Sequence, residues 1–459
     1  MKTDTIAAIA TGLTPSGIGI IRVSGEDAFN VASSVFRRKN GESIRIFESH
    51  RVYHGYVYDD DKLVDEIILL TMKGPKSYTG EDTVELQCHG GILVTKRVLD
   101  VVLKNGARIS EPGEFTKRAF INGRMDLSEA EAVIDVINSK NDMALNNSIK
   151  QLTGSLYEKI SSARNIILHE TAFIESALDD PEHYSLDGYS ERLGEIVEDL
   201  IRKLTFLKDS FYDGKTISEG INTVILGRPN VGKSSFFNIL AGKESAIVTE
   251  VAGTTRDLIK ESIYVDGITL NIVDTAGIHE TDDCVEQIGV DRALGIAKDA
   301  DLIIMVVDSS RPFSSEDEEI FSFIKNNNKK AIILLNKSDL DSVVTSEEIS
   351  MYISSEVISV SAKEEIGIDD FINFVKKEFH SGRLKYNDEL FISNIRQRDS
   401  LISSIDSLNN VLVSIKNMMP EDFYSIDLND AYESLGQILG EHVDEDLINE
   451  IFGKFCMGK

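Results

Sequence analysis

The sequence lacks the features by which membrane proteins and zinc proteins are recognised. Its longest apolar stretches, such as Leu302 to Val307, have the length of a strand, whereas a membrane-spanning helix needs about 20 apolar residues. The start, Met1 to Gly12, lacks the basic-then-apolar order of a signal peptide. The three cysteines, Cys88, Cys284 and Cys456, lie far apart without metal-ligand spacing. We therefore expect a cytoplasmic protein with free thiols, no zinc and no membrane span.

Basic residues are scarce compared with acidic ones. The chain has 48 Lys and Arg against 77 Asp and Glu, a net charge of -29. Most of such a surface repels a phosphate backbone, so nucleic acid must dock on a local basic patch or arrive through a partner. Internal repeats and low-complexity tracts are also missing, and 42% hydrophobic with 27% charged residues is typical of a globular protein.

The spacing of apolar residues divides the chain into four segments. Residues 1–121 mix short β-rich runs with one helical stretch, which predicts a small α+β domain. Residues 122–215 and 383–459 show helical spacing, which in the second segment returns after about Leu384, in Ile392 and Ile395. In residues 216–382 strands alternate with helices, which predicts a mostly parallel sheet with helices on both faces. Each helical half alone would lack partners for its apolar stripe, so we predict an α/β domain inserted into one helical domain.

The individual elements follow from the same patterns. The expected strands are Gly19 to Val23, Glu66 to Thr71, Thr83 to Cys88, Thr223 to Leu226, Leu270 to Val273, Leu302 to Val307, Ala331 to Leu335 and Val357 to Val360. The expected helices include Gly91 to Lys104 and Ser235 to Ala241.

The segment Gly227 to Ser234 has the pattern G-x-x-x-x-G-K-[ST] between an expected strand and an expected helix. Its glycines let the loop curl so that backbone amides face phosphates, and the helix N-terminus adds a favourable dipole. Lys233 is expected to reach the β- and γ-phosphates, and the Ser234 hydroxyl to bind Mg²⁺. The phosphate-contacting residues predicted here are Asn230, Val231, Gly232, Lys233, Ser234 and Ser235.

Two later segments predict guanine as the base. Asn336-Lys337-Ser338-Asp339 follows a strand, and the Asp339 carboxylate can accept from both N1-H and the 2-amino group of guanine. Adenine offers neither donor, and a site built on paired hydrogen bonds rejects the analogue that lacks them. Ser361-Ala362-Lys363 fits the last base-contacting loop. Asn336, Lys337, Asp339, Ser361, Ala362 and Lys363 are therefore predicted to bind the base of GTP rather than ATP.

Two segments between these motifs are candidates for sensing the γ-phosphate. Asp274-Thr275-Ala276-Gly277 ends a strand, which places Asp274 near the metal and the Gly277 amide near the γ-phosphate. Thr255, after Thr254, would complete the Mg²⁺ shell with Ser234. Ordinary loop polarity is the alternative for these threonines. Thr249, Thr255 and Asp274 to Gly277 complete the predicted GTP contacts.

Hydrolysis needs groups other than the usual ones. Many GTPases orient water with a Gln after the D-x-x-G element and use an arginine finger, but the residue here is the apolar Ile278. The side-chain carbonyl of Asn230 could hold a monovalent cation near the bridging oxygens, or it could shape the loop by a hydrogen bond. Glu286 could position the water, or be a solvated helix carboxylate. The residues alone leave both alternatives open.

The segment Ala246 to Asp257, Ile278 and the ending Cys456-Met457-Gly458-Lys459 resemble the MnmE (TrmE) family of tRNA-modification GTPases. The likeness covers essentially the whole chain and includes Gly19 to Gly25, Gly80 to Gly91 and Pro112 to Phe115. It implies a homodimer that, with an FAD-dependent MnmG (GidA)-type partner, modifies C5 of the wobble uridine (U34) of certain tRNAs to carboxymethylaminomethyl or aminomethyl-type derivatives.

The resemblance also implies cofactors and their residues. The one-carbon unit would come from 5-formyl- or methylene-tetrahydrofolate on the N-terminal domain, at positions Arg22, Glu85, Arg124 and Lys459. From composition alone, Arg22 and Glu85 would be ordinary strand residues. Many members have Lys where this chain has Arg124, and Met457 replaces a usual Ile or Leu, so the folate contact geometry can differ.

The catalytic residues implied by the resemblance are Glu286, Asn230, Lys233 and Cys456. The inserted α/β domain, residues 216–382, would be a Ras-like P-loop G domain. K⁺ would bind Asn230 and backbone oxygens of Thr249, Val251 and Thr254, and would drive pairing of two G domains. Glu286 matches the family's water-positioning glutamate. Cys456 is the family's terminal cysteine; its chemical role stays open, and a small buried apolar side chain is the alternative.

Two other functions compete with this hypothesis. An Era-like switch in ribosome assembly would be expected to carry a basic RNA-binding tail, whereas Glu421 to Glu450 is acidic. A folate-responsive scaffold without catalysis would not need GTP turnover.

Overall fold

The computed structural model describes residues 4–44, 48–242, 249–250, 260–265, 268–273, 294–379 and 389–459, with the backbone alone at 249, 250, 260, 261 and 265. The chain forms two compact units, each of which joins segments far apart in the sequence. The first unit comprises Met1–Ile137, Lys150–Glu198 and Ser403–Lys459; the second comprises Asn138–Ile149 and Asp199–Ile402.

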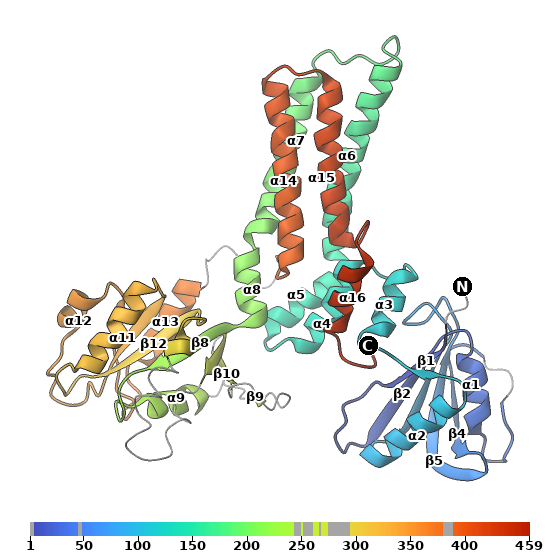
Figure 1. The fold of residues 1–459 in the computed structure, drawn as a ribbon, viewed down its shortest axis with the longest axis horizontal. Helices are drawn as coiled ribbons and strands as arrows, with labels where there is room; N and C mark the ends of the chain where they lie inside the picture. The colour runs from blue at the N-terminus through green and yellow to red at the C-terminus, as the bar shows by residue number, and fades with distance from the viewer. Residues whose placement is uncertain are drawn as a thin grey trace. The chain divides into compact units, whose positions relative to one another are not determined.

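The first unit contains a mixed sheet in the order β3-β4-β5-β6-β2-β1-β7 among its described strands (Figure 1). All neighbours are antiparallel except β1 and β7. The strands are β1 (Ile6–Ile9), β2 (Ile18–Ser24), β3 (Phe36–Arg37), β4 (Arg51–Asp59), β5 (Lys62–Met72), β6 (Thr83–His89) and β7 (Arg108–Ile109). Helices α1 (Ala28–Val35) and α2 (Ile92–Lys104) bury Val31 and Val98 in the same core as Leu86 of β6. The predicted α+β character is confirmed.

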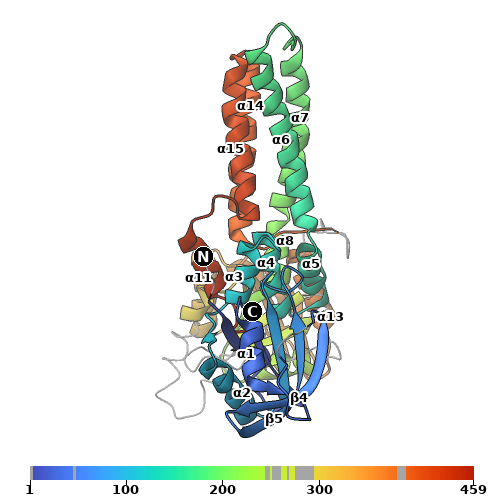
Figure 2. The same cartoon turned by 90° about the vertical axis from the view of Figure 1, so that its right-hand side faces the viewer.

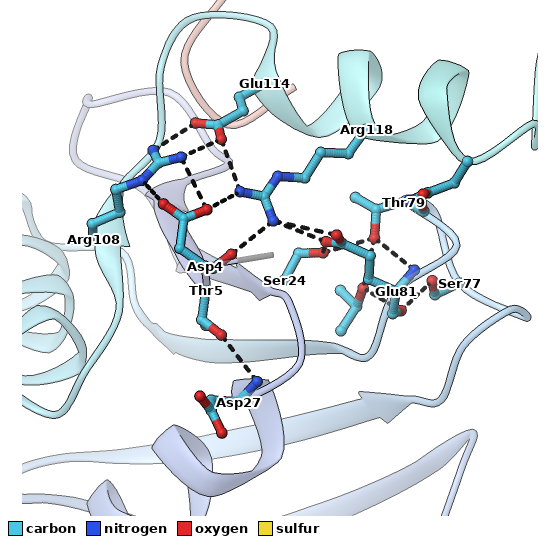
Figure 3. Close-up of polar contacts among 12 residues, drawn as sticks. Asp4, Thr5, Ser24, Asp27, Ser77, Thr79, Glu81, Arg108, Glu114 and Arg118 are labelled. Carbon is cyan, nitrogen blue, oxygen red and sulfur yellow. Dashed lines mark hydrogen bonds and ion pairs between the residues drawn. The ribbon is translucent and has the colours of Figure 1, made fainter. Parts of the chain in front are cut away.

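A buried ionic network fixes helix α3 (Glu114–Ile121) to this sheet, as Figure 3 shows. The guanidinium of Arg118, a residue only 9% exposed, donates to the Asp4 backbone oxygen at 2.8 Å and to Glu114 Oε1 at 2.9 Å. Its Nη1 lies 3.2 Å from Glu81 Oε2. Arg108 donates two further bonds to Glu114. Burial raises the pKa of Glu114, but the bonds from Arg108, the Glu111 amide and Arg118 outweigh it, so the pKa is lowered and the carboxylate stays charged.

Helices from both sides of the inserted segment pack together in the first unit. Helices α6 (Ser155–Asp179) and α15 (Glu421–Leu439) lie side by side in both views (Figures 1 and 2). Arg164 of α6 lies over the Tyr432 ring, 4.0 Å from its centroid, and pairs with Glu441. The other helices outside the inserted domain are α4 (Leu127–Asn138), α5 (Asp142–Leu152), α7 (Tyr189–Asp209), α8 (Phe211–Glu219), α14 (Ile395–Lys416) and α16 (Glu445–Gly453). The predicted insertion into a helical domain is confirmed.

The second unit contains the α/β domain. Its sheet has the order β14-β13-β12-β8-β11-β10-β9 among the described strands, and the pairs from β14 to β11 are parallel. The strands are β8 (Ile221–Leu226), β9 (Thr249–Glu250), β10 (Lys260–Val265), β11 (Ile268–Val273), β12 (Leu302–Asp308), β13 (Ala331–Asn336) and β14 (Glu356–Ser359). Because side chains alternate along a strand, Ile304 of β12 packs with one core and Met305 with the other. Helices α9 (Lys233–Gly242) and α13 (Ile368–Phe379) cover the first face, and α11 (Ser315–Asn326) and α12 (Ser346–Tyr352) the second.

The expected strands lie within observed ones except at one end: β14 stops at Ser359, whereas the expected strand continues to Val360. One helical expectation is wrong. Ile392 lies before α14, in a stretch without regular secondary structure, where its amide donates to Ser210 Oγ at 3.2 Å instead of to the carbonyl of a helical turn. No helix in the described ranges is long and apolar enough to cross a membrane. The domain boundaries at 121, 215 and 382 stay predictions.

Replacing Arg118 by Met should destabilise the packing of α3 by about 3 kcal/mol, since Glu81 and Glu114 would lose a buried counter-charge. Hydrogen exchange of the α3 amides measures this directly. The matched control is Arg97→Met on the exposed face of α2, which should leave exchange unchanged. Equal protection in Arg118→Met and the control would contradict the assigned role.

Candidate functional site

The predicted phosphate loop joins β8 to α9. Lys233 Nζ donates to the backbone oxygens of Gly227 at 2.7 Å and Arg228 at 2.8 Å, so the ammonium lies over the loop. Asn230 has φ 64 and an exposed side chain. Ser234 and Ser235 are also exposed in the first turn of α9. The loop therefore offers a cation, free hydroxyls and a helix N-terminus at one place, which suits a phosphate chain.

Asn336 connects this loop to the predicted base-binding loops. Its side chain is 2% exposed; Nδ2 donates to the Val231 backbone oxygen at 2.7 Å, and Oδ1 accepts from the Ala362 amide at 3.0 Å. The approach is so close that a Cβ on Gly232, which has φ 103, would lie 2.1 Å from Nδ2. Glycine at 232 is thus required by the Asn336 contact as well as by the backbone conformation.

Asp339 is held in the state that guanine recognition needs. Its Oδ1 accepts from Ser361 Oγ at 2.7 Å. This bond, together with the nearby charges of Lys363 and Lys337, lowers the pKa of Asp339 below its ordinary value. The carboxylate is therefore an acceptor at neutral pH and can receive two N-H donors from one base edge.

Two contacts that the sequence did not predict support these loops. Lys337 Nζ lies 2.6 Å from Oδ2 of Asp308, which is 1% exposed at the end of β12. Arg228 Nε lies 2.9 Å from Oδ2 of the fully buried Asp317 near the start of α11. Both carboxylates are buried and also accept hydrogen bonds from nearby serines, Ser310 for Asp308 and Ser314 for Asp317. No spacing in the sequence links them to the motifs.

The structure thus brings together one part of the predicted GTP site. The described members are Asn230, Val231, Gly232, Lys233, Ser234, Ser235, Asn336, Lys337, Asp339, Ser361, Ala362 and Lys363. Thr249 is described only as backbone of β9. The remaining predicted residues lie outside the described ones: Val251, Thr254, Thr255, Asp274, Thr275, Ala276, Gly277 and Glu286. The predicted γ-phosphate sensors and the water-positioning role of Glu286 therefore stay predictions.

A second set of predicted residues meets around the Tyr78 ring in the first unit. Arg22 on β2 donates to Glu85 Oε1 on β6 at 2.9 Å and to the Gly458 backbone oxygen at 3.2 Å. The tips of the three predicted cations lie near the Tyr78 ring centroid: Arg22 at 5.2 Å, Arg124 at 5.4 Å and Lys459 at 5.9 Å. Burial and the charge of Arg22 lower the pKa of Lys459. Tyr78 was not predicted, because a lone aromatic residue in a loop carries no motif.

Residues 456–459 are held against this sheet. Gly458 has φ 91, and a Cβ there would lie 2.4 Å from the Ile9 backbone oxygen, so only glycine fits. The Cys456 side chain is exposed, which excludes the alternative of a buried apolar residue. Cys88 is a buried free thiol.

Family comparisons match both parts of the chain. The model described as GTP-binding protein TrmE N-terminus matches residues 5–124, and the MnmE helical domain model matches residues 127–456. The chain belongs to the MnmE family of tRNA modification GTPases. The tRNA modification GTPase MnmE of Lachnoclostridium phytofermentans is 53% identical, covering 100% of both chains. That of Clostridioides difficile is 43% identical, covering 99% of both. The G domain of the T. maritima FeoB iron transporter covers 34% of this chain and 97% of its own, with 24% identity and a TM-score of 0.27.

Membership in the MnmE family confirms the resemblance and the coarse function that it implied, a GTP hydrolase of tRNA modification. The two matched segments together include the N-terminal sheet, the helices and the phosphate loop, so the family assignment applies to all three.

Replacing Asp339 by Asn should weaken GDP binding roughly 100-fold, because an ionised acceptor for two donors is lost. The amide can donate to the C2 oxygen of xanthine, so XDP should bind the variant better than GDP does. Titration with fluorescent GDP and XDP measures both effects. Asp341→Asn, two residues along and exposed, is the control and should bind GDP normally. An unchanged GDP affinity in Asp339→Asn would show that the base lies elsewhere.

Proposed function

We propose that this chain is the K⁺-dependent GTPase component that modifies C5 of the wobble uridine (U34) of certain tRNAs, together with an FAD-dependent MnmG (GidA)-type partner. The products are carboxymethylaminomethyl or aminomethyl-type derivatives, and the one-carbon unit comes from tetrahydrofolate. The carrying observation is full-length similarity to tRNA modification GTPases in a chain whose P-loop and base loops are joined by Asn336.

GTP and Mg²⁺ fit the residues present on the phosphate loop. The exposed hydroxyl of Ser234 in the first turn of α9 is a suitable oxygen ligand, and Thr255 is the proposed second protein ligand. Bound Mg²⁺ supplies charge neutralisation on the phosphates. Lys233 adds the second positive charge once its ammonium exchanges the carbonyls of Gly227 and Arg228 for phosphate oxygens. Glu286 is the proposed residue that orients the attacking water.

K⁺ fits the conformation of Asn230. At φ 64 the residue is in a left-handed conformation at the exposed tip of the loop, and its side chain makes no hydrogen bond to another described residue. This supports a ligand role over the alternative in which the side chain ties the loop internally. Backbone oxygens of Thr249, Val251 and Thr254 are the proposed further ligands, and the bound cation would favour pairing of two G domains in the homodimer.

A tetrahydrofolate fits the cluster around Tyr78. Glu85, held by Arg22, is an acceptor for the amide-like donors of a pterin ring, while Arg124 and Lys459 suit the carboxylates of its glutamate tail. Lys459 is half-buried, which lowers the pKa of its ammonium, and an anionic ligand binds more strongly in such a partly desolvated place. Cys456 is exposed among the residues preceding Lys459, and its role in the chemistry stays open.

The nucleosides of tRNA test the proposed function as a whole. Cells lacking this chain should contain unmodified wobble uridine, measured by mass spectrometry of digested tRNA, and the intact gene should restore the modified nucleoside. Unchanged nucleosides would refute the proposal. GTP-dependent co-sedimentation with ribosomes would then favour the ribosome-assembly alternative.

GTP hydrolysis should fall when Na⁺ replaces K⁺, because a site of one amide oxygen and backbone carbonyls is sized for the larger ion. The loss can reach roughly 10³-fold, the lower end of the effect of an arginine finger. Asn230→Ala should be slow in both salts, whereas Asn238→Ala, exposed on α9, should keep the K⁺ dependence. Steady-state phosphate release measures the hydrolysis rates of the unaltered chain and of both variants in the two salts. Equal rates of the unaltered chain in both salts would eliminate the cation site.

A further inference from the structure

One face of helix α5 is buried against the α/β domain. Asn141, Ala144 and Asn147 recur at the i, i+3, i+6 spacing that places side chains on one side of a helix. All three are buried, with exposed fractions of 8%, 3% and 5%. They belong to the segment Asn138–Ile149, which clusters with the second unit although the rest of α5 continues into the first. We call these three residues the α5 joint.

Asn141 connects three structural elements through one amide. Its Oδ1 accepts from the Ala144 amide at 2.8 Å and so caps the N-terminus of α5. Its Nδ2 donates to the Ile217 backbone oxygen of α8 at 2.8 Å and lies 3.3 Å from Thr269 Oγ1 of β11. Both hydrogens of the amide therefore have acceptors inside the second unit, one on α8 and one on β11.

Asn147 holds the segment by which the chain leaves that domain. Its amide pairs with the backbone of Phe391, donating to the oxygen at 3.1 Å and accepting from the amide at 3.1 Å. Phe391 packs with Ala144 and Ile217 in a small apolar cluster. The entering segment α8 and the leaving segment near Phe391 are thus fixed to the same face of α5.

A second polar connection reaches further along β11. Lys140 Nζ donates to Asn271 Oδ1 at 3.1 Å, and Asn271 Nδ2 donates to the Glu219 backbone oxygen at 2.8 Å. Ser262 of β10 donates to the same Asn271 oxygen at 2.8 Å. Lys140, the residue before the joint, thereby contacts β11 and, through Asn271, its antiparallel neighbour β10.

The position of β11 gives the joint a role. The strand runs from Ile268 to Val273 and leads directly into Asp274. Beside it, β8 runs parallel and leads into the phosphate loop. A strand pair hydrogen-bonded along its length moves as one body, so a displacement at the nucleotide end reaches Thr269 and Asn271. Helix α5 then continues from the joint toward Leu152 in the first unit.

We propose that the α5 joint transmits the nucleotide state of the G domain, through β11, to the helical part of the chain. This inference rests on the proposed GTP-driven tRNA modification. Asn141 is a positioning residue within it: it touches neither nucleotide nor tRNA, and its amide couples the movement of β11 to the start of α5.

Asn141→Ser separates the coupling from the helix cap. Serine caps a helix about as well as asparagine, but its hydroxyl is too short to reach Ile217 and Thr269. In the full chain with its partner, the variant should hydrolyse GTP within about twofold of the normal rate, while the yield of modified wobble uridine should fall ~10-fold, within the usual range of coupling between sites. Asn146→Ser, exposed on the same helix, should change neither.

Hydrogen exchange distinguishes a coupling role of Asn141 from a purely structural one. Between the GDP state and a GTP-analogue state, exchange in the unaltered chain should differ in β11 and in residues 141–152; in Asn141→Ser the difference should persist in β11 and vanish from α5. If the exchange difference in α5 persists in the variant, or is missing from the unaltered chain, the proposed role of the α5 joint is wrong. The proposed role is also wrong if Asn141→Ser leaves the yield of modified uridine unchanged, or if the variant loses GTP hydrolysis as strongly as it loses modification. Failure of the unaltered chain to modify tRNA would instead refute the proposed function.

Discussion

The buried amide of Asn336 donates to the Val231 backbone oxygen and accepts from the Ala362 amide, so one side chain fixes the phosphate loop relative to both base loops. Each buried polar group in such a place must be paired, or folding loses the full desolvation free energy of that group. The requirement extends to neighbours: Gly232 must be glycine to admit Asn336, and Ser361 holds Asp339 beside it. The spacing between the predicted phosphate loop and the predicted base loops is therefore set by the fold itself, which is the preorganisation that a selective site needs.

The same use of buried polar groups recurs wherever distant segments meet. Arg118 ties α3 to residues 4 and 81 of the first unit, and the amides of Asn141 and Asn147 tie α5 to α8 and Phe391 in the second. Apolar packing alone tolerates small sliding between elements, whereas hydrogen bonds with fixed directions define one register. A protein that converts a nucleotide state into action elsewhere needs such registers, because a displacement is transmitted only between parts that move together.

Much of the fold could be predicted from the sequence. Strand-sized apolar runs such as Leu302 to Val307 and the glycine pattern of the phosphate loop are local signals, and local rules place them on β12 and between β8 and α9. The long-range contacts could not be predicted in this way. Nothing near Asn336 in the sequence indicates Val231, 105 positions earlier, and Arg22 and Glu85 are ordinary strand residues until β2 and β6 pair. Ile392 has helical spacing, but it lies outside any helix, and its amide donates to Ser210 in a tertiary hydrogen bond.

In the proposed function, a guanine-nucleotide site in the inserted domain drives tRNA modification performed by the whole chain. This proposal is tested most directly by reconstituting the modification from the purified chain, its flavin-dependent partner, a folate one-carbon donor and unmodified tRNA. Yield is compared with GTP, with a non-hydrolysable GTP analogue and without nucleotide. The account predicts modified wobble uridine with GTP and little with the analogue or without nucleotide. Equal yields under the three conditions would contradict it.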